Sequence, residues 1–168
     1  MPNILEFTCS KSLELPFLSI MNGKQTNNEA LKKFVSQNKR TLNQCGCYIF
    51  YKKAGKGTIP IYVGKTSISF EKEIFTSDKL KKIEKYFSKS VHKKIHIQFI
   101  CYPKKQGKIN NKKINELERY LIQESFKKNP EILNKHHASM STWIIKDYHN
   151  PKQGRPSHEA NILKSILL

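Results

Sequence analysis

The stretch from Gly46 to Thr66 constrains the fold of this chain more than any other. Two short runs rich in aromatic and β-branched residues, 47–52 and 59–65, flank the sequence Ala-Gly-Lys-Gly. Glycines between two such runs are typical of a turn, so the stretch is predicted to form a β-hairpin. Because side chains alternate between the two faces of a strand, Tyr48 of the first run and Tyr62 of the second can share one face.

The spacing of hydrophobic residues predicts the other elements. Helices are expected at 29–38, 77–88 and 112–127, and a further strand at 94–102. Residues 1–28 contain apolar side chains without a sustained period, so they are expected to form an irregular arm packed on the domain. A chain of 168 residues can bury one core. The prediction is a single α+β domain: a small three-stranded antiparallel sheet flanked by helices, with N- and C-terminal extensions.

The charge of the chain indicates the class of its partner. Lysine and arginine total 31 against 13 acidic residues, a formal net charge of +18. Because neutralising phosphates releases condensed counterions, so large an excess favours a nucleic acid as partner. No membrane contact is expected, since the chain has no long apolar segment and no lipidation motif, and the lack of a secretory signal predicts a cytoplasmic protein. The four cysteines lack zinc-site spacing and are expected to be free thiols.

Glu118 lies where an apolar residue is expected. In the helix predicted at 112–127, the apolar side chains form one stripe: Ile114, Leu117, Leu121, Ile122 and Phe126. Glu118 falls in the middle of this stripe, whereas Glu116 points to the opposite, solvated face. A buried carboxylate is costly unless it is paired or bound to a cation, so Glu118 is either salt-bridged or functional.

Four motifs, in order along the chain, resemble those of the GIY-YIG nucleases. They are Gly46-Cys47-Tyr48, Tyr62-Val63-Gly64, Glu118 on its predicted helix, and Asn134 after Pro130. The hexapeptide at 60–65, Pro-Ile-Tyr-Val-Gly-Lys, is similar to that of the type II restriction endonucleases of this superfamily. The resemblance covers about 46–134. It implies a core at 45–137, an N-terminal arm and helix at 1–44, and a C-terminal extension at 138–168.

The resemblance implies metal-dependent hydrolysis of phosphodiester bonds in double-stranded DNA. Glu118 would bind one Mg²⁺ or Mn²⁺ ion per active site. Tyr48 would accept the proton of the attacking water, with its pKa lowered by the cation and by nearby lysines. Tyr62 and Lys65 would position the water and the phosphate, and Asn134 would fix the geometry.

The sequence departs from the family on the helix predicted at 77–88. The restriction enzymes of the superfamily carry an arginine there and a histidine four residues later, and this chain has neither. The matching positions look like Lys82 and Tyr86. Lysine keeps the positive charge but loses the planar fork of arginine, and tyrosine can still exchange a proton. As residues on a basic surface, both also fit an ordinary solvated flank of a helix.

Basic residues outside these motifs are expected to contact DNA: Lys104 and Lys105 in a lysine-rich loop, and His149, Lys152 and Arg155 in the tail. Cutting both strands of a palindrome commonly requires two copies of the enzyme, so a homodimer on DNA is implied. Two alternatives remain open, a less specific repair or mobile-element nuclease and a DNA-binding derivative that has lost catalysis. If Glu118 is neutralised by a basic neighbour, or turned away from both phenols, the nuclease assignment is expected to fail and only a basic scaffold is left.

Overall fold

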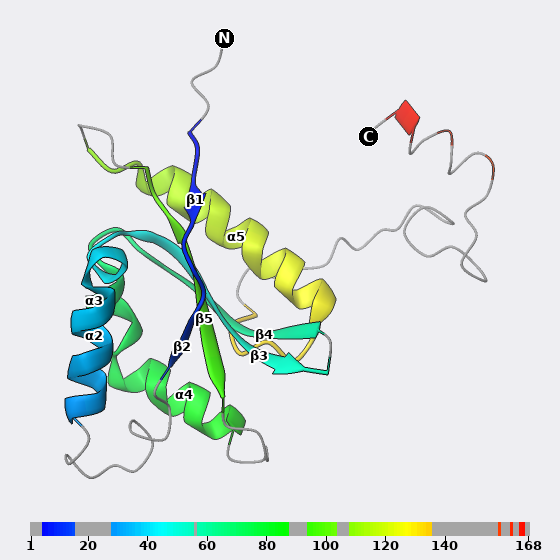
Figure 1. Cartoon of the computed structure of the whole chain (residues 1–168). Coiled ribbons are helices and arrows are strands. Elements are labelled where there is room, and N and C mark those ends of the chain that lie inside the picture. Colours follow the sequence, from blue (N-terminus) through cyan, green and yellow to red (C-terminus); the bar gives the residue numbers. More distant parts are fainter. Residues whose placement is uncertain are drawn as a thin grey trace. The chain divides into compact units, whose positions relative to one another are not determined.

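The structure, a computed structural model, describes residues 5–15, 28–55, 57–87, 94–103 and 108–135, together with 158, 162, 165 and 166. The chain divides into two units, Met1–Ala138 and Ser139–Leu168, and all elements named below belong to the first. In chain order they are β1 (Thr8–Cys9), β2 (Leu13–Leu15), α2 (Asn28–Leu42), β3 (Gly46–Ala54), β4 (Gly57–Thr66), α3 (Phe70–Ile74), α4 (Ser77–Phe87), β5 (Ile95–Cys101) and α5 (Asn111–Lys128) (Figure 1). The fold is α+β with an antiparallel sheet.

The predicted hairpin and third strand form the centre of this sheet. β3 pairs with β4 on one side and with β5 on the other, both antiparallel. The strand order is β1-β5-β3-β4, so β4 lies at an edge. Gly46 is required at the start of β3, because its φ of +137° disfavours other residues and a Cβ there would overlap the carbonyl oxygen of Ile100.

The prediction of a three-stranded sheet was wrong, because the N-terminal arm adds two short strands. β1 and β2 both pair with β5, which gives the sheet five strands. In β2, Leu13 and Leu15 are partly or fully buried on either side of the exposed Glu14. Two or three residues are too few to show a period in the sequence, and pairing with the existing edge of β5 supplies the hydrogen bonds that fix them.

The helices match the predicted positions, with shifted ends. α2 runs on to Leu42, which is fully buried, and therefore extends beyond the predicted end at 38. The Asn110 side chain caps α5 by accepting a hydrogen bond from the Lys113 amide at 3.2 Å. Among the described residues, no helix is both long and apolar enough to cross a bilayer.

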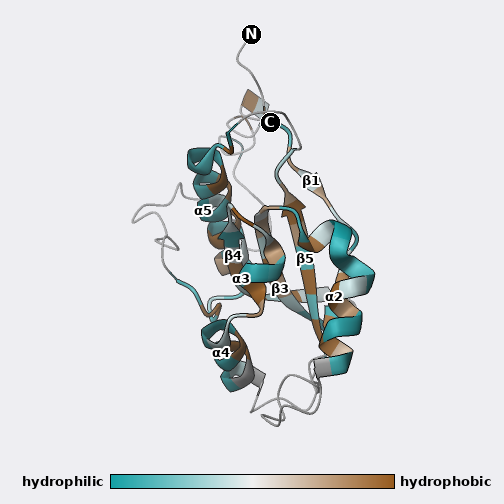
Figure 2. Cartoon of the chain, turned by 90° about the vertical axis from the view of Figure 1, so that its left-hand side faces the viewer, coloured by the Kyte–Doolittle hydropathy of each residue, from teal (hydrophilic) through white to brown (hydrophobic). Residues whose placement is uncertain are grey.

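The two faces of the sheet bury different sets of side chains. On one face, Tyr48 and Phe50 join the main core with residues of α2, α3 and α4. On the other, Cys47 and Val63 pack against α5. Figure 2 shows hydrophobic strands lying between α5 and α2. Alternation along β3 and β4 therefore decides which side chains face α5 and which face the main core.

Candidate active site

Tyr48 and Tyr62 share one face of the sheet, as alternation along the strands predicts. Their rings are stacked, with centroids 6.3 Å apart and planes at 28°. Tyr48 is fully buried, and Phe70 of α3 meets its ring edge-on at 6.2 Å. The stack therefore lies where the main core reaches the outer strand β4.

The two glycine-containing triplets fit together through Tyr48. Its ring lies across Gly64, where a Cβ would overlap the hydroxyl oxygen and the adjoining ring carbon. Gly64 thus makes room for the phenol, and the hydroxyl lies over β4. Among the described residues, the Tyr48 hydroxyl is a buried side-chain group without a hydrogen-bond partner. Buried polar groups nearly always have partners, so the partner of this hydroxyl is expected to lie outside the described residues.

Glu118 forms an ion pair with Lys65. The Lys65 Nζ lies 2.5 Å from the Glu118 Oε2, and the side chains are 40% and 13% exposed. Glu118 is therefore salt-bridged, which is one of the two possibilities expected for a carboxylate in the apolar stripe. Its partner, Lys65, is itself a predicted site residue. Lys65 alternates with Gly64, so this pair lies on the α5 side of β4 and the phenols lie on the other side.

The carboxylates of Glu118 and Glu73 affect the pKa of both phenols. Burial, followed by the carboxylates of Glu118 and Glu73, raises the pKa of Tyr62 to about 12. Burial, and then Tyr62, Glu73 and Glu118, raise the pKa of Tyr48 still further. The expectation that nearby lysines lower the pKa of Tyr48 is wrong for the protein groups alone. At neutral pH, Tyr48 is a neutral phenol that can donate a hydrogen bond.

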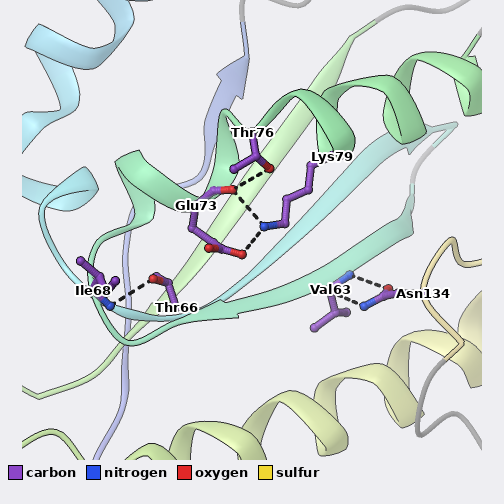
Figure 3. A network of polar contacts seen from close by, with 7 residues as sticks. All are labelled: Val63, Thr66, Ile68, Glu73, Thr76, Lys79 and Asn134. Atoms are coloured by element: carbon purple, nitrogen blue, oxygen red, sulfur yellow. Dashed lines mark hydrogen bonds and ion pairs between the residues drawn. The ribbon is translucent and has the colours of Figure 1, made fainter.

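Glu73 and Lys79 form a second ion pair near the phenols. Neither residue belongs to the sequence motifs. Glu73 of α3 and Lys79 of α4 point toward one another in Figure 3. The Lys79 ammonium also donates to the Glu73 carbonyl oxygen at 3.0 Å, and its side chain is only 14% exposed. A sequence signal existed, since Lys79 precedes the buried Ile83 by four residues and so shares the inward face of α4.

The structure places the two predicted site residues of α4, Lys82 and Tyr86, in different surroundings. Lys82 is exposed, and the half-buried Tyr86 lies beneath Lys52, whose Nζ is 5.2 Å from the ring centroid. Lys52 is four residues along β3 from Tyr48. The lysine of α4 that faces inward is therefore Lys79. The predicted DNA contacts lie outside the described residues: Lys104, Lys105, His149, Lys152 and Arg155.

Asn134 binds the edge of β4 rather than the phenols. Its side-chain oxygen accepts from the Val63 amide at 3.1 Å, and its side-chain nitrogen donates to the Val63 carbonyl (Figure 3). The neighbouring Leu133 amide donates to the Ile61 carbonyl at 2.8 Å. Asn134 thus joins the segment after α5 to β4.

A cleft of about 370 Å³ lies at the end of β4. Lys65 and Glu73 line it together with Asn111 and Asn115 of α5. No group of three or more His, Cys, Asp or Glu side chains suited to a metal occurs in the described ranges. Mg²⁺ keeps several waters and takes one or two carboxylates, so the hard oxygens of Glu118 suit it without a larger cluster.

Comparisons of the chain with protein-family models, with curated proteins and with solved structures find no match. The likeness to the GIY-YIG nucleases therefore stays a prediction from the motifs.

Proposed function

We propose that this protein is a metal-dependent endonuclease that hydrolyses phosphodiester bonds in double-stranded DNA, as a type II restriction enzyme does. The observation that carries the proposal is the buried Tyr48 hydroxyl, which has no partner among the described residues and lies over Gly64, the neighbour of Lys65 in β4. The net charge of +18 supports DNA as the partner. A cytoplasmic location and a homodimer on DNA belong to the same proposal.

The roles follow from the state of each side chain. Tyr48 is neutral, so its hydroxyl donates a hydrogen bond to the attacking water or to a phosphate oxygen. Lys65 has a half-exposed ammonium that can contact the phosphate. Glu118 would hold Mg²⁺, which supplies charge neutralisation at the phosphate. Asn134 keeps the segment after α5 on β4.

The ion pair between Lys65 and Glu118 favours a second candidate, a DNA-binding derivative without catalysis. It neutralises the carboxylate, and the pair lies on the α5 side of β4, away from the phenols. Both are outcomes expected of a basic scaffold. Two features nevertheless favour a nuclease over the DNA-binding derivative. The Lys65 side chain is 40% exposed, so a phosphate that approaches from solvent can reach its ammonium. The pair also leaves the Tyr48 hydroxyl unexplained.

Incubation of the protein with plasmid DNA and Mg²⁺ or Mn²⁺ tests the proposal. Discrete fragments indicate a restriction enzyme, and nicks or a smear indicate a less specific nuclease. A plasmid that shifts in a gel but stays intact indicates the binding derivative. Glu118→Ala should abolish cleavage while DNA binding persists, and cleavage by this variant would remove the carboxylate from the mechanism. Glu116→Ala, two residues away on the solvated face of α5, is the matched control.

A further inference from the structure

Glu73 is held close to Tyr48 by a short, well-anchored helix. Phe70 and Ile74 of α3 are buried, and the Phe70 ring contacts Tyr48 edge-on at 6.2 Å. Glu73 follows Phe70 by three residues, so it lies one turn from that contact. It also lines the same cleft as Lys65, whose ammonium binds Glu118. The cleft is therefore lined by an acidic residue of α3 and by the lysine that pairs with Glu118.

The Tyr48 hydroxyl provides an independent observation, and it lies over Gly64, which precedes the cleft-lining Lys65 in β4. It is fully buried, and it has no hydrogen-bond partner among the described residues. An unsatisfied buried hydroxyl costs about 1–3 kcal/mol, which a bound water or hydrated ion would offset. The carboxylates of Glu73 and Glu118 both raise the pKa of this phenol, so negative charge lies near it from two separate helices.

We propose that Glu73 is the second carboxylate of a site for one hydrated divalent cation, which it forms with Glu118 beside the Tyr48 hydroxyl. The inference rests on the proposed function and extends it. Mg²⁺ and Mn²⁺ in such sites keep several waters and take one or two carboxylates, so Glu73 acts through a bound water. Glu118 is the less exposed of the two acids and is the direct ligand.

In the protein without a bound cation, each of the two carboxylates forms an ion pair with a lysine. Lys65 pairs with Glu118, and Lys79 pairs with Glu73. An ammonium and a divalent cation compete for the same carboxylate oxygens. Removal of either lysine is therefore expected to strengthen cation binding in the absence of DNA.

Mn²⁺ binding to the DNA-free protein tests the inference without any measurement of cleavage. The electron paramagnetic resonance signal of free Mn²⁺ gives the affinity and the number of ions bound. We expect Glu118→Gln to weaken binding about 100-fold and Glu73→Gln about 10-fold. Glu71→Gln on α3 and Glu116→Gln on α5 are matched controls, because each removes one acid from the same helix, and both should bind Mn²⁺ as the unchanged protein does.

A structural role of the Glu73–Lys79 pair predicts a different pattern. Lys79→Gln breaks the same ion pair but keeps the carboxylate, so it should bind Mn²⁺ at least as tightly as the unchanged protein. If Lys79→Gln weakens binding as much as Glu73→Gln, the effect comes from the junction of α3 and α4 and the inference is overturned. Equal binding by Glu73→Gln and Glu71→Gln overturns it as well. Thermal unfolding of each variant checks that it is folded.

The inference and the proposed function can fail separately. Mn²⁺ binding that depends on Glu73 in a protein that leaves DNA intact supports the cation site and refutes the nuclease. Cleavage by the unchanged protein, together with unaltered Mn²⁺ binding in Glu73→Gln, supports the nuclease and refutes the role of Glu73.

Discussion

Tyr48 lies across Gly64 so closely that no side chain fits beneath its ring. A Cβ at Gly64 would overlap the phenolic oxygen and approach Cε1 to 2.9 Å. Tyr48 is fully buried between β4 and the main core, so the ring cannot move aside without repacking. The glycine of the second triplet and the tyrosine of the first are thus one packing unit.

Gly64→Ala should therefore destabilise the protein. We expect the free energy of unfolding to fall by about 1–3 kcal/mol, the usual cost of overpacking, and any cleavage activity to fall with the displaced hydroxyl. Urea denaturation measures the first effect. Gly57→Ala in the same strand is the control, because a Cβ there is 3.8 Å from its nearest neighbour. Equal stability of the two variants would contradict the packing argument.

Tyr48→Phe should have opposite effects on stability and on function. It removes a buried hydroxyl that has no partner among the described residues, so the free energy of unfolding should rise by about 1 kcal/mol while cleavage falls. Tyr51→Phe is the control, because its hydroxyl lies 2.5 Å from the Ser12 Oγ and its loss should lower stability. Chemical denaturation and a plasmid assay measure both quantities. A Tyr48→Phe variant less stable than the unchanged protein would show that the hydroxyl has a partner within the chain.

Stability should decline above pH 10 because of the phenols. The folded state raises the pKa of Tyr62 from 10 to about 12, so between these values the folded state binds more protons than the unfolded state. The free energy of unfolding then falls with rising pH, by at most about 1.4 kcal/mol per pH unit for each phenol. The stability that the protonated phenols contribute is fully present below pH 10. Urea denaturation at several pH values should give a smaller decline for Tyr62→Phe. Equal slopes for the two proteins would refute the raised pKa.

Asn134→Ala should loosen the segment after α5 from the edge of β4. The variant loses two hydrogen bonds to Val63, so we expect a loss of about 1–3 kcal/mol in the free energy of unfolding. Faster hydrogen exchange at the Leu133 amide, which bonds to the Ile61 carbonyl, should accompany it. The exposed Asn115→Ala on α5 is the control. If exchange at Leu133 is unchanged, the Asn134 side chain does not hold the segment.

The sequence by itself determined the hairpin, the third strand and the main helices, because each has a period or a cap that acts over a few neighbouring residues. Alternation placed Tyr48 and Tyr62 on one face, and the 3.6-residue period identified Glu118 as the acid in an apolar stripe. These features depend on local geometry, which a sequence pattern records directly.

Only the tertiary structure decided what each charged side chain meets. Lys65 and Glu118 are 53 residues apart in the chain, and the pairing of Glu73 with Lys79 depends on how α3 and α4 pack on the sheet. The two N-terminal strands likewise exist only because β5 offers them an edge. Charges and short strands take their partners from the fold, because their interactions are made across space and leave no period in the sequence.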